Sequence, residues 1–235
     1  YSFTDSPNIG AIHSFSFHNY VTLFTTPELI DMIIGSIALA IGSAVLATIL
    51  GTTGAIGAFY SKKNVNGTMS VLNQIPVVNA DVVTGFSLCI LLVVVFGVSK
   101  NTYIPLIIGH TVLSAPFVYL AVVPKLKQMD PSLYEAALDL GATPGYSLIH
   151  IIIPQIASGI VSGFVMAVTL SLDDYFVATY TKPATFDTIS TYVVNATKGS
   201  QTNIKTALWA LSTIIFLIVV IVEVVMNFAP IKNEA

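Results

Sequence analysis

The chain has 235 residues, of which 54% are hydrophobic and only 9% charged, and its mean hydropathy is +0.83. Ordinary soluble domains contain about 25% charged residues, so this composition excludes one and predicts a polytopic membrane protein. The net charge is −3, every basic residue is a lysine and the chain has no basic run, which argues against nucleic acid as a partner. The single cysteine, Cys89, excludes an internal disulfide.

Five apolar runs are long enough to cross the membrane, since about 20 helical residues span about 30 Å of hydrocarbon. They are continuous rather than alternating, and a segment in lipid must satisfy its own backbone hydrogen bonds, so each is predicted to be a helix. The fold class is therefore an all-α, polytopic transmembrane helical bundle, a single domain over residues 1–235. The runs cover residues 33–59, 77–98, 103–123, 149–172 and 208–228.

The lysines next to these runs predict the topology. The chain opens at Tyr1 without a methionine or a charged leader, and we expect a further, sixth span before it. Lys62 and Lys63 follow the first run, and Lys125 and Lys127 follow the third. Because lysines in short loops favour the cytoplasmic side, residues 124–147 are predicted to be cytoplasmic and residues 173–207 external.

The cytoplasmic loop contains the pattern of a short amphipathic helix. Asp130 is a suitable N-cap, Pro131 suits the first turn, and Gly141 is a stop signal. Such a helix can rest on lipid or dock into a protein groove, and its small alanines favour docking. The expected apolar stripe is Leu133, Ala136, Ala137 and Leu140.

The same loop reproduces a spaced motif, E-A-A-x3-G-x9-I-x-L-P, with Ile153 as a conservative replacement for its leucine. On this motif the chain resembles the membrane subunits of binding-protein-dependent ABC importers. The resemblance implies a type I permease fold and a loop that docks on the importer's ATPase dimer. The residues it assigns to ATPase coupling are Glu135, Ala136, Ala137, Asp139, Gly141, Ile151 and Pro154.

Two further stretches, Asn79 to Leu88 and Ser171 to Val177, resemble the C-type permeases of spermidine/putrescine importers. That family implies a second homologous permease subunit and an external polyamine-binding protein as partners. No G-x4-G-K-[ST] sequence is present, so this chain is expected to be non-catalytic and to bind no cofactor itself. ATP and magnesium are then expected on the partner ATPase.

Three acids at the ends of predicted spans favour a cationic substrate. Asp81 lies in the first turns of the second run, and Asp173 and Asp174 end the fourth; acids at such depth normally face a bundle interior or an aqueous pathway. Tyr175 and Phe176 would add cation–π contacts with ammonium groups. We assign these five residues to a substrate pathway, although the acids could instead only cap helix ends near the headgroups.

Two other features of the spans have structural explanations. Small residues recur every fourth position at Gly159, Gly163, Ala167 and Ser171, a spacing that favours close helix packing over a pathway lining. His110 has no second histidine or cysteine at ligand spacing, so a packed or hydrogen-bonded imidazole is expected.

We expect a plasma-membrane permease that imports polyamines by ATP-driven alternating access. An ion-coupled secondary transporter would use Asp81 and Asp173 as ion sites, but should show an inverted repeat with broken helices, which the sequence does not reveal. A permease for another small solute would keep the Glu135 loop and, for an anion, replace the acids.

Overall fold

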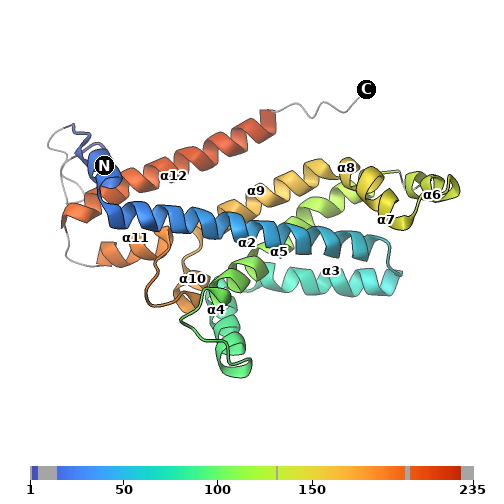
Figure 1. The fold of residues 1–235 in the computed structure, drawn as a ribbon, viewed down its shortest axis with the longest axis horizontal. Coiled ribbons are helices and arrows are strands. Elements are labelled where there is room, and N and C mark those ends of the chain that lie inside the picture. Colours follow the sequence, from blue (N-terminus) through green and yellow to red (C-terminus); the bar gives the residue numbers. More distant parts are fainter. Residues whose placement is uncertain (1, 5–14, 131, 199–201, 229–235) are drawn as a thin grey trace.

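The computed structural model describes all residues except 1, 5–14, 131, 199–201 and 229–235, and the described part is almost entirely helical (Figure 1). The all-helical architecture expected from the apolar runs is confirmed. Two segments, η1 and η2, are π-helical. The elements are α1 (His18–Thr25), α2 (Pro27–Phe59), α3 (Lys63–Val78), α4 (Asp81–Cys89), η1 (Ile90–Val95), α5 (Ile104–Gln128), α6 (Ser132–Asp139), α7 (Pro144–Ser147), η2 (Leu148–Ile152), α8 (Ile153–Gln155), α9 (Ala157–Asp173), α10 (Phe176–Thr181), α11 (Ile189–Lys198) and α12 (Thr202–Phe228).

Helices α2 and α5 are each long and apolar enough to cross a membrane on their own. Helix α2 contains the predicted run 33–59 and begins before it, and α5 contains the predicted run 103–123 except Tyr103 and continues past it. Pro27 at the first position and Glu28 in the first turn suit a helix start, so α2 begins before its apolar run. Likewise, Lys125 and Lys127 suit a last turn, so α5 continues past residue 123.

The predicted runs 77–98 and 149–172 are broken rather than continuous, so the expectation of unbroken helices is wrong. Asn64–Val78 and Asp81–Val95 meet at 104°, across the extended backbone of Asn79 and Ala80. Pro144–Gln155 and α9 meet at 71°. Counting each bent pair as one span, the described residues contain up to four spans.

A proline lies next to each break. Pro76 sits inside α3, three residues before Asn79, and Pro154 follows the π-helical η2 just before the bend at Ile156. Proline has no backbone N–H and disturbs the regular hydrogen-bond ladder, so these bends have local causes. The run 208–228 lies within α12, and the expected span before Tyr1 lies outside the described residues. The total of five or six spans therefore stays a prediction.

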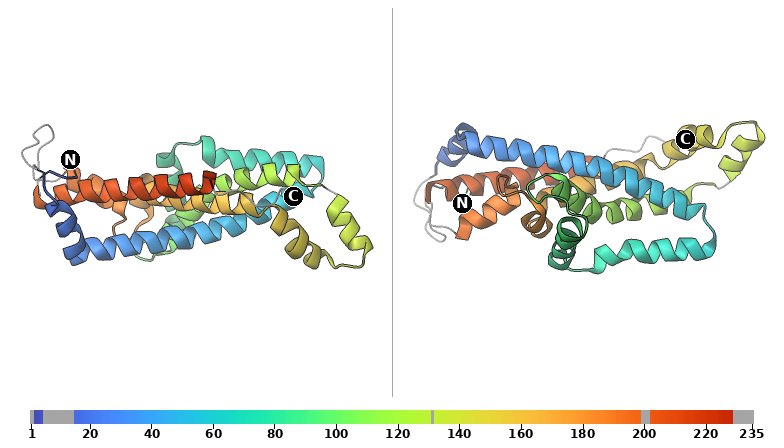
Figure 2. Two further views of the ribbon diagram at one scale, coloured as in Figure 1. Left: turned by 90° about the horizontal axis from the view of Figure 1, so that it is seen from above. Right: turned by 60° about the horizontal axis from the view of Figure 1, so that its bottom comes forward.

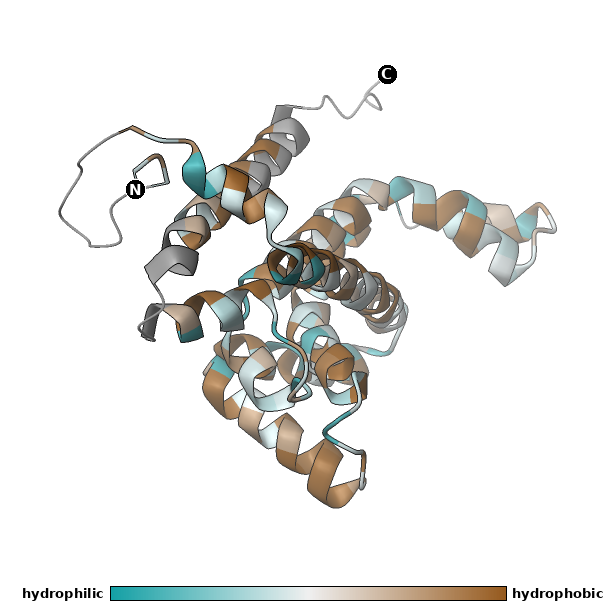
Figure 3. Ribbon diagram, turned by 60° about the vertical axis from the view of Figure 1, so that its left-hand side comes forward, coloured by the Kyte–Doolittle hydropathy of each residue, from teal (hydrophilic) through white to brown (hydrophobic). Residues whose placement is uncertain are grey.

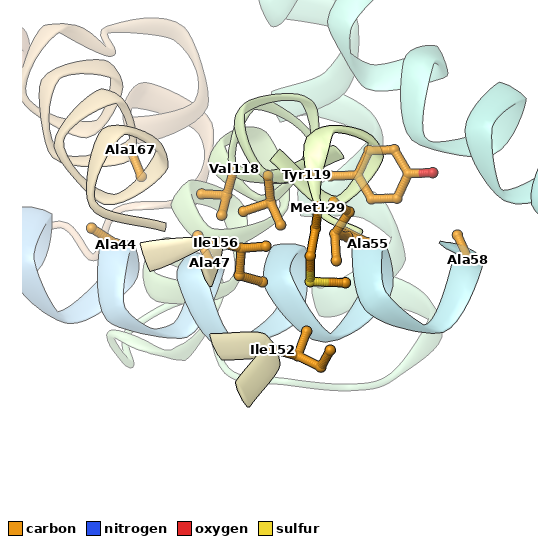
Figure 4. Packing of buried hydrophobic residues seen from close by; sticks show 12 residues of the cluster. Ala44, Ala47, Ala55, Ala58, Val118, Tyr119, Met129, Ile152, Ile156 and Ala167 are labelled. Carbon is orange, nitrogen blue, oxygen red and sulfur yellow. The ribbon is translucent and has the colours of Figure 1, made fainter. Parts of the chain in front are cut away.

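The core joins α2, α5 and α9 through small residues. A Cβ added at Gly51 of α2 would lie 2.7 Å from Val118 Cβ of α5, and one added at Gly163 of α9 would lie 3.0 Å from Val118 Cα. Figure 4 shows alanines of α2, such as Ala44 and Ala47, near Val118. Close approach of backbones through small residues is the usual way membrane helices associate. The small-residue stripe of α9 is a packing surface, as expected: its members Gly159, Gly163, Ala167 and Ser171 are all buried.

Large apolar side chains also cover outer faces of the bundle, where brown segments are visible in Figure 3. Leu50 of α2 and Val94 of η1 are examples, with exposed fractions of 57% and 74%. Outward apolar faces suit contact with lipid or with neighbouring membrane helices. A second hydrophobic cluster at the start of α2 includes Leu23, Leu29 and Leu208, and joins α1, α2, α11 and α12, the last of which lies lengthwise along the bundle (Figure 2).

Candidate functional site

The junction between α9 and α10 positions two of the predicted acids differently. Helix α9 ends at Asp173, and the backbone is extended at Asp174 before α10 begins at Phe176. Asp173 is exposed, whereas Asp174 is 8% exposed. The Asp174 carboxylate accepts the backbone N–H of Val177 at 3.2 Å and that of Ala178 at 2.7 Å. Asp174 therefore caps the start of α10, because it satisfies N–H groups that have no partner within the helix.

Packing of α4 on α10 brings the third acid to the same region. A Cβ added at Gly85 of α4 would lie only 2.8 Å from the Cα of Val177, so the two backbones are in close contact. Asp81 stands in the first turn of α4 and is exposed. The carboxylates of Asp81 and Asp173 both lie within electrostatic range of Asp174. Asp81 and the adjacent pair Asp173 and Asp174 thus form one negative region, although Asp81 is far from the pair in sequence; such a region disfavours anions and attracts cations.

A cavity of about 440 Å³ opens beside Asp173 and Tyr175, between α9, α11 and α12. Small-molecule sites commonly enclose about 300–1,000 Å³, with mostly apolar walls and a few placed polar groups. The hydroxyl groups of Ser190 and Ser212 contribute to such a wall, together with valine, leucine and isoleucine side chains. Ser190 also donates to the backbone carbonyl of Leu172 at 2.8 Å, which links α11 to the end of α9.

The aromatic side chains of the predicted pathway are adjacent. The rings of Tyr175 and Phe176 lie 5.2 Å apart, and Phe176 is 42% exposed. Only Tyr175 lines the cavity. Among the residues that the structure describes, no group of three or more His, Cys, Asp or Glu side chains could hold a metal ion.

The position of His110 at this site was not predictable from the sequence. The imidazole is completely buried, Nδ1 lies 2.7 Å from the Ser171 hydroxyl, and Nε2 lies 3.6 Å from Asp174 Oδ2. The expectation of a packed, hydrogen-bonded imidazole is confirmed. Its proximity to Asp174 could not be deduced, because the 63 residues between them give no signal of the contact.

Residues 124–147, predicted to be cytoplasmic, include the expected short helix, α6, at the end of the bundle opposite to α11 (Figure 1). Asp130 accepts the backbone N–H of Ser132 at 2.9 Å, and this bond helps to lower the pKa of Asp130. Gly141 has a positive φ of 88°, with N–H bonds from Gly141 to Leu138 and from Ala142 to Ala137. This is a Schellman stop, as the glycine predicts. Pro131 lies outside the described residues.

The orientation of α6 differs from the predicted stripe. Only Ala137 of the four stripe residues is buried, and Leu140 is 89% exposed. Instead Tyr134 turns inward, where its ring lies 5.1 Å from Tyr60 and packs on the core. The stripe divides in this way because a short helix with apolar residues on two sides can bury only one side against its own bundle. The outward side presents Leu133, Glu135, Ala136, Asp139 and Leu140.

The last two motif residues lie in the π-helical connection that follows α6 and α7. Ile151 is half-buried in η2, and Pro154 is exposed in α8. Contacts between α6 and η2 hold the loop helix on this connection. The connection leads directly into α9, so a displacement of α6 has a covalent and packed route to the acids at the far end of α9.

Residues 51–229 match the family described as "Binding-protein-dependent transport system inner membrane component". The chain belongs to this family. It is thus a non-catalytic, multi-pass inner membrane permease of an ABC importer that works with an ATPase and a binding protein. Over 224 residues it is 30% identical to the spermidine/putrescine transport system permease protein PotC of Haemophilus influenzae, covering 94% of this chain and 84% of that one. It is 31% identical over 186 residues to the putrescine transport system permease protein PotI of Escherichia coli K12, covering 77% and 66% respectively.

Solved structures share the fold of this permease at low sequence identity. A bacterial ABC transporter involved in the import of the acidic polysaccharide alginate matches with a TM-score of 0.70 and 19% identity, over 94% of this chain and 85% of that one. The MetNI methionine ABC transporter matches with a TM-score of 0.60 and 14% identity, over 87% and 95%. Since one of these takes up an acidic polymer, the fold by itself says nothing about the charge of the solute.

Proposed function

We propose that this permease imports polyamines such as spermidine and putrescine by alternating access, with a second homologous permease completing the pathway. One observation supports this proposal above the others: Asp173 is an exposed carboxylate on the wall of a largely apolar cavity, in electrostatic range of a second acid. A polyamine has ammonium groups separated by methylenes. Carboxylates can pair with the ammonium groups while apolar walls contact the methylenes.

In this proposal Asp81, Asp173, Asp174, Tyr175 and Phe176 belong to the substrate pathway in distinct ways. Asp173 pairs directly with ammonium groups, and Tyr175 and Phe176 offer aromatic faces worth about 0.5–2 kcal/mol each. Asp81 adds negative potential from α4. Asp174 acts from the interior, because its oxygens are already engaged by α10. The similarity to polyamine permeases at about 30% identity supports the same substrate class.

The outward side of α6 is proposed to dock on the ATPase. Its exposed leucines and acids need a partner surface, and the small Ala136 allows close approach. ATP binding would close the ATPase dimer and move α6, and the movement would pass through η2 and α8 into α9. The pathway would then open outward to receive polyamine from an external binding protein, and hydrolysis would reset it.

The test is uptake of labelled spermidine by the complete importer reconstituted in vesicles. We expect uptake that needs ATP, resists an uncoupler, and is competed by putrescine but not by amino acids or oxyanions. An active ATPase without spermidine uptake would leave the importer in place and refute the substrate. Uptake that the uncoupler abolishes even with ATP present would favour an ion-coupled transporter. The lack of broken helices no longer argues against that alternative, because the structure contains two bent helix pairs.

A further inference from the structure

A buried polar network crosses the core of the permease. His110 of α5 is completely buried, and its Nδ1 lies 2.7 Å from the hydroxyl of Ser171 on α9. The Ser171 hydroxyl lies 3.2 Å from that of Ser43 on α2. Because buried polar groups are costly unless they are paired, these contacts tie the three core helices in one arrangement.

The second ring nitrogen points out of this network, toward the substrate region. His110 Nε2 lies 3.6 Å from Asp174 Oδ2 and, within the described part of the chain, has no hydrogen-bond partner. The same carboxylate oxygen accepts the Ala178 N–H of α10. The imidazole therefore faces the group that caps α10.

The chemistry of the neighbours assigns the tautomer. A carboxylate only accepts hydrogen bonds, so the proton belongs on Nε2, facing Asp174. Nδ1 then accepts from the Ser171 hydroxyl. In this arrangement the single N–H of a neutral imidazole is directed at the carboxylate, and the other nitrogen accepts a hydrogen bond from Ser171 of α9.

We infer that His110 is a positioning residue of the transport pathway: it holds Asp174, and through it the start of α10, so that the adjacent Asp173 faces the cavity. This role rests on the proposed function. The neighbouring Gly109 supports it, because a Cβ there would lie 2.8 Å from Val177 Cγ1, so α5 and α10 touch at this level. Movement of α5 must then displace the α9–α10 junction.

Two amide substitutions separate the two contacts of the ring. In His110→Asn the amide can replace Nδ1 and keep the Ser171 contact, but it does not reach Asp174. In His110→Gln the longer amide can replace Nε2 and keep the Asp174 contact. Loss of the electrostatic contact between the ring N–H and the Asp174 carboxylate is taken to correspond to about a tenfold effect. At saturating loaded binding protein, we expect spermidine uptake to fall about tenfold in His110→Asn and to stay within about twofold in His110→Gln.

His18→Asn is the matched control, because His18 is an exposed histidine of α1 outside the cavity lining. Its uptake should equal that of the unmodified complex. The ATP hydrolysis rate and complex recovery are measured for all three variants. Equal uptake by His110→Asn and His110→Gln, in complexes with equal ATPase activity, would overturn the inference.

A second readout does not depend on the substrate. With Cys89→Ala as background, Asp173→Cys is labelled by a membrane-impermeant thiol reagent in the complete complex. We expect His110→Asn to change the labelling rate about tenfold and His110→Gln to change it less than about twofold. If the unmodified importer hydrolyses ATP but takes up no spermidine, only the proposed substrate fails, and labelling still decides the role of His110. If His110→Asn does not assemble, His110→Gln decides alone: near-unchanged labelling supports the inference and a tenfold change contradicts it.

Discussion

Gly51 of α2 faces Val118 of α5 so closely that a methyl group added at Gly51 would lie 2.7 Å from Val118 Cβ and 2.7 Å from the Ala115 carbonyl oxygen. The Ala115 oxygen is a backbone atom and Val118 Cβ is bonded directly to the backbone. Neither atom can move away by a side-chain rotation. Val118 also lies against Gly163 of α9, so this one residue of α5 packs against both α2 and α9.

Gly51→Ala should therefore destabilise the permease by overpacking, by about 1–3 kcal/mol. The measurement is the thermal denaturation of the purified complex in detergent. Gly42→Ala is the control on the same helix, because nothing lies within 4 Å of a Cβ at Gly42. Equal denaturation temperatures for the two variants would contradict the packing derived for α2 and α5.

The two neighbouring acids should respond differently to neutralisation. Asp173→Asn should leave assembly intact and lower spermidine uptake about tenfold, as expected for one lost charge-assisted contact. Asp174→Asn should in addition reduce complex recovery, because an amide offers one acceptor oxygen where the carboxylate offers two to α10. Asp31→Asn, an exposed acid outside the cavity lining, is the control. Unchanged uptake by Asp173→Asn would remove this residue from the pathway.

The stop of α6 depends on the backbone of Gly141, whose φ is 88°. Because L-residues pay about 1–2 kcal/mol in this region, Gly141→Ala should loosen the end of α6 and reduce binding of the ATPase. Gly145→Ala is the matched control: it has no positive φ and nothing within 4 Å of its added Cβ. Co-purification of the ATPase with each variant measures the effect. If ATPase co-purification falls equally in Gly141→Ala and Gly145→Ala, the loop is sensitive to alanine in general and the effect does not come from the helix stop.

Charge reversal at Glu135 should uncouple the importer. Glu135 is exposed on the outward side of α6, so Glu135→Lys should fold normally and lower ATP-dependent uptake by weakening docking. Uptake and ATP hydrolysis are measured together. The control is the same charge reversal at Glu28, in the first turn of α2. Normal uptake by Glu135→Lys would argue that this side of α6 contacts something other than the ATPase.

Local chemistry made α6 largely predictable. Its cap at Asp130 and its stop at Gly141 are encoded in neighbouring residues, and both features are present in the structure. The buried side was not predictable. Tyr134 rather than Leu140 turns inward because Tyr60 and the core offer it a surface, and that surface is built from residues distant in sequence.

The sequence by itself determined the membrane class, the helical fold and the importer family, because composition, apolar run length and a spaced loop motif are all local properties of the chain. Only the tertiary structure decided how sharply the helices bend and which acid is exposed. Pro76 and Pro154 mark where bends are favoured, but not the angles of 104° and 71° that the structure has there. The burial of Asp174 against His110 arises from contacts between α5, α9 and α10, and a contact between residues 64 positions apart leaves no pattern along the chain.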